Sequence, residues 1–312
     1  MSNYPKVTVV GAGNVGATAA MLLLMHDLAD VVLIDVAEGL PQGKALDMMH
    51  MRSIEQFGPS IVGTNDYADT AGSDIVVITA GVPRKPGMTR DDLLAINSKI
   101  MESVITQAAT VSPDALFICV TNPLDVMTYL ARKVSGLPAN RVFGMGGVLD
   151  SARFAFAVAE KTGAPVESVR AMAIGAHGDA MTPMAALTTV GGVPITETLS
   201  ADEVEALVQR TIFGGAEVVA LLKTGSAFYA PAASVVAMVR AILGESGDIL
   251  PVCAFLDGEY GVSDMYMSVP ARLGRTGVAE VVEVELSDAD LARLQGSAAT
   301  VGAQLDEMGL RG

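Results

Sequence analysis

The first half of the chain alternates short apolar runs with amphipathic stretches. The apolar runs are rich in β-branched residues and predict strands at residues 6–10, 31–35, 74–79 and 115–121. Because neighbouring positions within these runs are apolar, both faces of each strand are expected to be buried, as in a parallel sheet. The stretches between them predict helices at residues 16–25, 43–52 and 91–110. This alternation predicts an α/β fold with a doubly wound parallel sheet.

The second half of the chain has longer helical stretches and predicts a different architecture. Helices are expected at residues 149–162, 201–223 and 234–243, and strands at residues 169–174, 260–270 and 277–286, the last two antiparallel around a turn. Ser287 is expected to cap a final helix, with Asp288 and Asp290 complementing the helix dipole in its first turn. The pattern is typical of an α+β domain, so we predict two domains, residues 1–147 and 148–312.

The composition excludes several classes of protein. Of the 312 residues 51% are hydrophobic, and the mean hydropathy is +0.44. No run of about 18 uninterrupted apolar residues is present, so we expect no membrane span, and the apolar excess is expected to cover interfaces between subunits. The net charge of −15 disfavours binding to nucleic acid and to anionic membrane surfaces. It also means that a site for an acid needs a local cluster of arginines.

Cysteine content and the start of the chain indicate a compartment. Only Cys119 and Cys253 are present, and Cys119 lies in an apolar, strand-like run, so a disulfide framework is not expected. Residues 1–6 show no leader of signal-peptide form. These features favour a reducing cytoplasm.

A glycine-rich motif follows the first predicted strand and opens the first predicted helix. Its residues are Gly11, Ala12, Gly13, Asn14, Val15 and Gly16. Gly11 permits a tight turn, Gly13 lets the backbone approach a pyrophosphate, and Gly16 lets helix and strand pack closely. Asp35, at the end of the next strand, would bond a ribose 2′-hydroxyl and repel a 2′-phosphate, which favours NAD over NADP. The motif predicts a Rossmann-type dinucleotide-binding domain, but flavin and other nucleotide binders share it, so it does not name a reaction.

A loop rich in proline and glycine follows the strand predicted at residues 74–79. It runs from Gly81 to Asp91 and carries Arg84 and Arg90. Guanidinium groups suit bidentate binding of carboxylates, so the loop is a candidate lid, hinged at Gly81, over an anionic substrate. A solvated basic loop is the alternative.

One of the three histidines has the surroundings of a proton carrier. His26 at a helix end and His50 within a helix are expected to be structural. His177 lies between glycines on a turn after a predicted strand, which is a poor place for core packing. Asp150 and Arg153 share one face of a predicted helix, and a carboxylate that touches His177 would fix its tautomer and favour its protonated form. A purely structural Asp–Arg pair is the alternative, and no metal ligands are predicted.

Together these motifs resemble the lactate/malate dehydrogenase family over essentially the whole chain. They occur in family order and spacing at residues 11–16, 79–90, 121–125, 150–153 and 175–179. The resemblance implies an NAD-dependent oxidoreductase in which the nicotinamide accepts or delivers a hydride at C2 of a 2-hydroxy acid. Since relatives assemble as dimers or tetramers, it also implies a homodimer or a homotetramer.

The resemblance implies a role for each site residue. His177 exchanges a proton with the C2 oxygen of the substrate, and Asp150 orients and charges His177. Arg153 binds the C1 carboxylate, and Arg90 polarises the reacting carbonyl. Asn122 positions both the substrate and the nicotinamide. The cofactor site is further lined by Asn97, Val120, Thr121 and Asn122.

Arg84 is expected to select the substrate within the family. Lactate-specific members carry a neutral glutamine at this loop position, whereas malate-specific members carry arginine. A desolvated arginine that faces a methyl group lacks its partner, which typically costs about 2–5 kcal/mol, roughly a 30-fold to several-thousand-fold preference. The resemblance therefore implies reversible oxidation of (S)-malate to oxaloacetate, a reaction of the tricarboxylic acid cycle.

Two alternatives stay open, and one local feature departs from the family. The chain could be a dehydrogenase of lactate or another 2-hydroxy acid, or a non-catalytic NAD-binding sensor. Ser226 or Ala227 stands where lactate enzymes place a threonine close to the substrate methyl. This departure would leave room for a longer acid.

Overall fold

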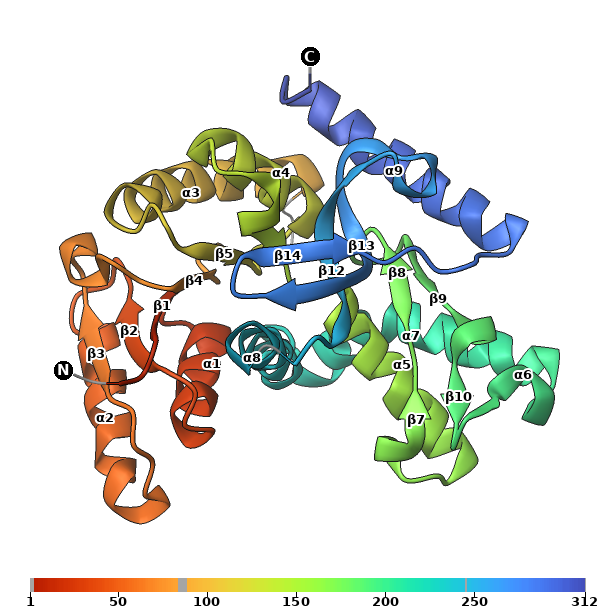
Figure 1. Ribbon diagram of the computed structural model, residues 1–312, viewed down its shortest axis with the longest axis horizontal. Helices are drawn as coiled ribbons and strands as arrows, with labels where there is room; N and C mark the ends of the chain where they lie inside the picture. The colour runs from red at the N-terminus through yellow and green to blue at the C-terminus, as the bar shows by residue number, and fades with distance from the viewer. Residues whose placement is uncertain (1–2, 84–88, 245, 312) are drawn as a thin grey trace. The chain divides into compact units, whose positions relative to one another are not determined.

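The computed structural model describes residues 3–83, 89–244 and 246–311 (Figure 1). These residues form two compact units. Unit 1 contains the described residues of Met1–Met145, Phe228–Asp248 and Leu273–Ala279, and unit 2 contains those of Gly146–Ala227, Ile249–Arg272 and Glu280–Gly312. The chain first changes unit close to the boundary expected after residue 147. Two later segments, which the sequence placed in the second domain, belong to unit 1.

In the described part of unit 1, a parallel sheet of six strands forms the centre. The strand order is β3 (Ile61–Thr64), β2 (Asp30–Ile34), β1 (Lys6–Val10), β4 (Ile75–Ile78), β5 (Leu116–Cys119) and β6 (Val142–Gly144), and all neighbouring strands are parallel. Every residue of β4 and β5 is buried, which explains their continuous apolar sequence. The predicted doubly wound parallel sheet is confirmed. β3 and β6 were not predicted, because β3 is only partly buried and contains Gly63, and β6 has only three residues.

Helices cover both faces of this sheet. Figure 1 shows α3 (Arg90–Val111) and α4 (Leu124–Ser135) on one side of the strands, and α1 (Asn14–Met25) with α8 (Tyr229–Gly244) on the other. Helix α2 (Leu40–Glu55) packs along β3. Short 3-10 turns lie at η1 (Tyr67–Thr70) and η2 (Ala139–Arg141). Because α8 packs against α1, part of the second half of the chain belongs to unit 1.

Unit 2 combines long helices with antiparallel strands. Its helices are α5 (Gly147–Thr162), α6 (Ile195–Thr198), α7 (Ala201–Leu222) and α9 (Asp288–Glu307). Four strands lie in the order β12 (Ile249–Asp257), β13 (Ser263–Gly274), β8 (Ala173–Gly175) and β9 (Met181–Pro183), each antiparallel to the next. A small sheet contains β11 (Val193–Pro194), β10 (Thr189–Val190) and β7 (Val169–Arg170). Short 3-10 turns lie at η3 (Val166–Ser168), η4 (Ala185–Leu187) and η5 (Glu259–Gly261). The predicted α+β character is confirmed.

Several strand predictions in the second half were wrong in detail. Residues 169–174 form β7 and β8 in two different sheets, because the chain leaves the ladder for two residues between them. Only Gly277–Val281 of the strand predicted at residues 277–286 is a strand, β14. β12 was not predicted, because Pro251 argues against a strand. In the structure Pro251 lies opposite Pro270 of β13.

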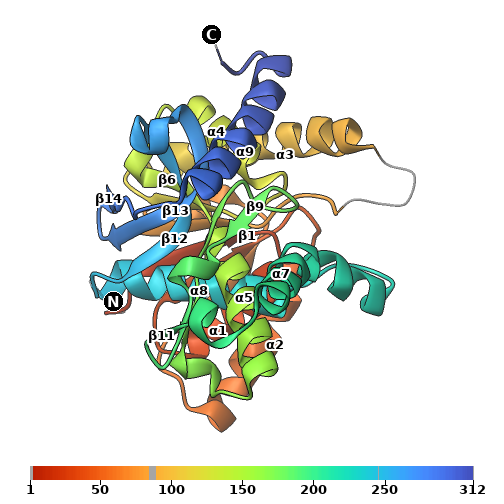
Figure 2. The ribbon, with the colours of Figure 1, turned by 90° about the vertical axis from the view of Figure 1, so that its right-hand side faces the viewer.

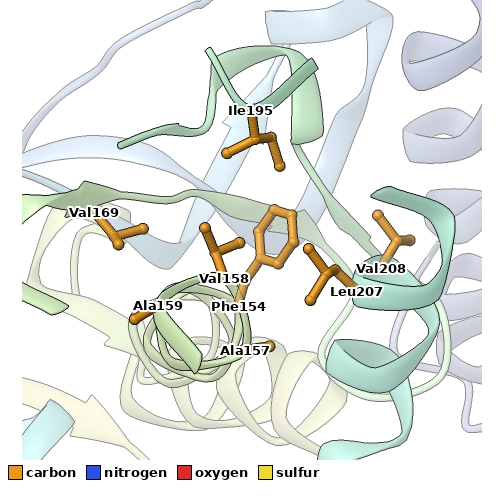
Figure 3. Close-up of a cluster of buried hydrophobic side chains, with 8 residues drawn as sticks. All are labelled: Phe154, Ala157, Val158, Ala159, Val169, Ile195, Leu207 and Val208. Carbon is orange, nitrogen blue, oxygen red and sulfur yellow. The ribbon is translucent and has the colours of Figure 1, made fainter. Parts of the chain in front are cut away.

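A buried cluster in unit 2 holds α5 in place. It surrounds Phe154 of α5, which is fully buried (Figure 3). Ile195 at the start of α6 and Leu207 and Val208 of α7 belong to the same cluster, and α5 and α7 lie side by side (Figure 2). Because Phe154 is the neighbour of Arg153 in the chain, this packing fixes the part of α5 that carries candidate site residues.

Candidate active site

The glycine loop between β1 and α1 packs as the motif predicts. Gly11 has a positive φ of 106°, and its N–H donates to the carbonyl oxygen of Ile34 (2.8 Å). A Cβ on Gly11 would lie 2.7 Å from Thr79 Oγ1, and a Cβ on Gly16 would overlap the carbonyl oxygen of Gly11. Neither position has room for a side chain, because β1, α1 and the end of β4 approach closely here.

The surroundings of Gly13 are open. A Cβ at this position would meet no described atom within 4 Å, and Gly13 is the N-cap of α1. Asn14 and Val15 follow as the first residues of the helix. The backbone of Gly13 therefore lies at the positive end of the helix dipole, where a phosphate group binds favourably.

Asp35 follows β2 and faces the glycine loop. Its Oδ2 accepts a hydrogen bond from the N–H of Ala12 (2.7 Å), and its Oδ1 accepts one from the N–H of Ala37 (2.9 Å). Burial and, next, the charge of Asp35 raise the pKa of Tyr67 to about 12. Asp35 thus places a negative charge beside the loop, where a ribose hydroxyl could donate to it.

Sequence reasoning missed Lys44 of α2. Its Nζ donates to the carbonyl oxygen of Ala12 (2.6 Å). Ala12 is therefore held by Asp35 through its N–H and by Lys44 through its carbonyl group. No local pattern could identify Lys44, because it lies far beyond the glycine motif in an ordinary amphipathic helix.

The segments after β4 and β5 lie at the carboxyl ends of neighbouring strands, as predicted. The N–H of Val120 donates to the carbonyl oxygen of Ile78 (2.9 Å), which continues the ladder by one residue. Thr121 Oγ1 donates to the carbonyl oxygen of Ala80 (2.7 Å). Asn122 is exposed, and the peptide bond that follows it is cis. Ligands of doubly wound sheets bind at such strand ends.

Asn97 of α3 is buried against both of these segments. It is only 1% exposed. Its Oδ1 accepts a hydrogen bond from the N–H of Val82 (2.9 Å), and its Nδ2 donates to the carbonyl oxygens of Val82 (3.2 Å) and Asn122 (2.7 Å). The side chain therefore joins the segments through their backbones.

Only part of the predicted arginine loop is described. Arg84 lies outside the described residues, and so does the side chain of Arg90, whose backbone begins α3. A capping box fixes this helix start: Thr89 Oγ1 accepts from the N–H of Asp92, and the Asp92 carboxylate accepts from the N–H of Thr89 (3.0 Å each). The lid and its hinge at Gly81 stay predictions.

In unit 2, Asp150 contacts two other candidate site residues. Its Oδ2 lies 2.8 Å from His177 Nδ1, and its Oδ1 lies 3.3 Å from Arg153 Nη1. The Asp150 side chain is 2% exposed, whereas those of His177 and Arg153 are 13% and 19% exposed. The carboxylate is thus buried, while the imidazole and the guanidinium reach the surface. The structure brings these three predicted residues together.

The start of α5 places Asp150 against the strands of unit 2. A Cβ on Gly147 would lie 2.7 Å from the carbonyl oxygen of Pro251 and 2.8 Å from that of Ala173. Only a residue without a side chain allows this approach. Asp150, in the first turn of α5, is consequently held close to the strand from which His177 emerges.

His177 follows β8 on a turn that needs glycine on both sides. Gly175 and Gly178 have φ values of 93° and 108°, a region that L side chains rarely adopt. The N–H of Ala176 donates to Ser297 Oγ of α9 (3.4 Å). These features direct the chain so that the imidazole reaches Asp150.

Arg153 packs on a glycine pair of α7 that sequence reasoning did not use. A Cβ on Gly214 would lie 3.4 Å from Arg153 Cδ, and a Cβ on Gly215 would lie 3.5 Å from Arg153 Nη2. These are ordinary van der Waals distances, so Arg153 lies along this part of α7, and an added methyl group would touch it without a clash. Two adjacent glycines within a long predicted helix are unfavourable for helix stability, and this was the signal for a packing role.

The remaining candidates lie away from this group. His26 is the exposed C-cap of α1, and His50 is exposed on α2. Ser226 is exposed and Ala227 is half-buried, both in the segment between α7 and α8.

The group on Asp150 suits the transfer of one proton at an oxygen atom of a small acid. Because an ionised carboxylate only accepts hydrogen bonds, His177 Nδ1 carries a hydrogen, and Nε2 is the atom that gains or loses the second proton. Arg153 supplies cationic donors for a carboxylate. Over the described residues, no group of three or more His, Cys, Asp or Glu side chains could hold a metal ion. None of the helices in the described ranges combines the length and the apolar character that a membrane crossing needs.

Two family models match consecutive parts of the chain. The one described as lactate/malate dehydrogenase, NAD binding domain, matches residues 5–144, and the one described as lactate/malate dehydrogenase, alpha/beta C-terminal domain, matches residues 147–309. Malate dehydrogenase of Roseiflexus sp. (strain RS-1) is 50% identical over 301 residues, which is 96% of this chain and 97% of that protein.

Solved structures of two different enzymes resemble the chain equally well. Malate dehydrogenase of Cryptosporidium parvum has a TM-score of 0.95 and 42% identity, covering 98% of this chain and 99% of that one. Lactate dehydrogenase of Cryptosporidium parvum, solved with lactic acid and nicotinamide adenine dinucleotide, has a TM-score of 0.94 and 41% identity with the same coverage. The backbone alone therefore does not separate the two activities.

Proposed function

The chain belongs to the lactate/malate dehydrogenase family, and we propose that it catalyses the reversible, NAD-dependent oxidation of (S)-malate to oxaloacetate. The observation that carries the proposal is the pairing of His177 and Arg153 on one buried carboxylate, Asp150. A proton carrier and a carboxylate-binding cation are thereby available to the same small acid. Curated relatives with about half of their residues identical over nearly the whole chain are malate dehydrogenases, which supports the choice of substrate.

The residues of unit 1 fit NAD. Gly13 offers open backbone at the N-terminus of α1, and Gly11 and Gly16 permit the close packing beneath it. Asp35 would accept a hydrogen bond from a ribose hydroxyl and repel a 2′-phosphate, which favours NAD over NADP. When bound, NAD supplies the acceptor for the hydride that leaves C2 of malate. The residues assigned to its binding are Gly11, Ala12, Gly13, Asn14, Val15, Gly16, Asp35, Asn97, Val120, Thr121 and Asn122.

The residues of unit 2 manage the proton and the substrate carboxylate. In malate oxidation, His177 takes the proton of the C2 hydroxyl on Nε2. Asp150 holds the tautomer with hydrogen on Nδ1 and compensates the positive charge that develops on the ring. Arg153 binds the C1 carboxylate. Two residues of unit 1 have roles assigned by the resemblance: Asn122 orients the substrate, and Arg90 polarises the reacting carbonyl.

A spectrophotometric assay tests this proposal. The protein mixed with NADH and oxaloacetate should consume NADH. His177→Asn should lose turnover and keep its affinity for NADH, because it removes the proton carrier and leaves unit 1 unchanged. Turnover of His177→Asn at the wild-type rate would exclude His177 as the proton carrier. A wild-type protein that binds NADH and turns over no 2-oxo acid would favour the non-catalytic sensor.

The choice of malate over lactate depends on Arg84. Arg84→Gln should shift the ratio of kcat/KM values from oxaloacetate toward pyruvate, because the second carboxylate of oxaloacetate loses its cation. The expected shift is about 30-fold or more, the lower limit for losing one partner of a desolvated charge pair. An unchanged ratio would remove Arg84 as the selecting residue.

We also propose that the protein forms a homodimer or a homotetramer and lies in the cytoplasm. Large apolar side chains are exposed on several of the described helices, for example Ile54 on α2 (76%), Phe156 on α5 (56%) and Leu221 on α7 (76%). Apolar surface of this kind is commonly covered by another subunit. Cys119 and Cys253 are buried thiols, which suits a reducing compartment.

A further inference from the structure

The first turn of α5, which carries Asp150, is held by a serine hydroxyl at each end. At its start, the N–H of Gly147 donates to Ser268 Oγ of β13 (2.9 Å). At its end, Ser151 Oγ accepts from the N–H of Ala173 in β8 (2.8 Å). Both serines are buried. Because a buried N–H without an acceptor is costly, the two bonds fix the place of this turn against the strands.

Both hydroxyl contacts lead to the strand that presents His177. Ala173 is the first residue of β8, and His177 follows the end of that strand. Ser268 lies opposite Gly175, the last residue of β8, in the ladder of β13 and β8. The backbones of Asp150 and His177 are therefore connected by two short routes, one at each end of β8, in addition to their own side-chain contact of 2.8 Å.

We propose that Ser151 and Ser268 are positioning residues for the proton transfer, which act by setting the Asp150 carboxylate against the imidazole of His177. This inference rests on the proposed function, because His177 carries the proton there. A hydrogen bond weakens steeply as its distance and angle depart from the optimum. A shift of the first turn of α5 would therefore weaken the contact that holds the tautomer of His177, although Asp150 and His177 themselves are unchanged.

The test compares Ser151→Ala and Ser268→Ala with Ser234→Ala. Ser234 of α8 is also buried, but its described hydrogen bond goes to the carbonyl oxygen of Ala230 in the same helix (2.8 Å). It therefore controls for the loss of one buried hydroxyl group that joins no second element. Three quantities are measured: kcat and KM for oxaloacetate, NADH affinity by titration of NADH fluorescence, and hydrogen exchange of the two backbone amides that bond to the serines.

Ser151→Ala and Ser268→Ala should each lower kcat by about 5–50-fold, somewhat less than the ~100-fold cost of a misplacement of about 1 Å. NADH affinity should change by less than about threefold, because the glycine loop lies in unit 1, far from the change in sequence and contacts. The Ser234→Ala kinetics should match the wild type. The amide of Ala173 should exchange faster in Ser151→Ala, and that of Gly147 in Ser268→Ala, because each loses this acceptor.

A double-mutant cycle separates positioning of the carboxylate from general support of the fold. In the Asp150→Asn background, Ser151→Ala should lower kcat by less than about twofold, because the carboxylate that the serine positions is already absent. A merely structural serine would cost the same factor in both backgrounds. Ser268→Ala is measured in the same cycle, so the test also stands if Ser151→Ala does not fold.

Two results would overturn the inference. Both serine variants could turn over oxaloacetate at the rate of Ser234→Ala, or their losses could persist in full in the Asp150→Asn background. If the wild type consumes no NADH with oxaloacetate, the proposed function fails instead. The amide exchange is independent of turnover, and unchanged exchange in both serine variants would then show that the hydroxyl groups do not hold α5 against the strands.

Discussion

One carboxylate oxygen of Asp150 contacts His177, and the other contacts Arg153. Asp150→Asn keeps the shape of the side chain but must turn an N–H toward one of these donors. We expect kcat/KM for oxaloacetate reduction to fall by about 10²–10⁴, the range of general acid–base catalysis. NADH affinity should stay at the wild-type value, because the glycine loop is untouched. Steady-state kinetics with an NADH titration check both, and a fall of less than about tenfold would contradict the role given to Asp150.

At the scale of residues, the sequence predicted which residues belong to the candidate site better than it predicted the contacts between them. The pairing of Asp150 with Arg153 follows from helix geometry, since residues three apart share a face. The contact of His177 with Asp150 joins two elements, and from the residues alone it was one of two alternatives. Lys44 and the glycine pair of α7 were not identified, because their partners also lie on other elements and no local pattern reports them.

At the scale of elements, two glycines at the junction of β1 and α1 have different roles: Gly16 is needed for packing, and Gly13 for binding. Gly16→Ala would press a Cβ into the carbonyl oxygen of Gly11, whereas a Cβ at Gly13 would meet no described atom within 4 Å. Gly16→Ala should therefore lower the free energy of unfolding by about 1–3 kcal/mol, as overpacking does.

Gly13→Ala should leave stability nearly unchanged but weaken NADH binding by about tenfold or more, ~1.4 kcal/mol, because its methyl group occupies the approach of the pyrophosphate. Urea unfolding and NADH titration of both variants check this pair. Equal NADH affinity of Gly13→Ala and wild type would exclude the glycine loop as the pyrophosphate site.

The contacts at the N-terminus of α7 should make the stability of the fold depend on pH. Ser200 Oγ accepts from the N–H of Glu203, and Glu203 Oε2 accepts from the N–H of Ser200 (3.0 Å). Lys161 of α5 forms an ion pair with Glu203 (2.7 Å). Lys161 first, and then Ser200, lower the pKa of Glu203 from 4.5 to about 2. Since the pKa is lower in the folded state, the carboxylate stabilises the fold above pH 4.5 and loses this effect as the pH falls toward 2.

Glu203→Gln should therefore be less stable than the wild type at neutral pH and converge with it as the pH falls toward 2. Urea midpoints measured across this range check the prediction. Glu205→Gln, at an exposed position of the same helix, is the matched control and should leave the midpoint nearly unchanged. A deficit of Glu203→Gln that persists unchanged in acid would contradict the ionic origin of the effect.

Among the elements, the continuous apolar strands and the long helices were predicted, whereas β12 and the shortest strands were not. β1, α7 and the cap of α9 at Ser287 lie where the pattern places them. The apolar run at residues 142–144 and the two-residue strands of unit 2 are too short for a period to appear. Their pairing depends on neighbours that are distant in sequence.

At the scale of the whole molecule, no sequence pattern showed that two segments of the second half of the chain belong to unit 1. α8 has an apolar surface suited to any core, and its packing on α1 is decided by tertiary structure. The high apolar content of the sequence was more informative. It predicted apolar surface for contacts between subunits, and large apolar side chains are exposed on several of the described helices.

The exposed apolar side chains predict a defined assembly. Light scattering should give a particle of two or four times the 32.1 kDa chain mass. Ile54→Glu and Leu221→Glu each place a charge on a side chain that is 76% exposed, so at least one of them should reduce the mass without unfolding the chain. A wild-type particle with the mass of one chain would exclude the proposed oligomer.

The shared carboxylate of Asp150 connects two equilibria. An anion at Arg153 changes the charge that faces one oxygen, and a proton on His177 changes the charge that faces the other. Such linkage is reciprocal: if the imidazolium strengthens the hold on a dicarboxylate, the dicarboxylate strengthens the hold on the proton by the same factor. Arrival of oxaloacetate would then recruit the proton that reduction consumes, and release of the dicarboxylate would weaken proton binding at the ring by the same factor.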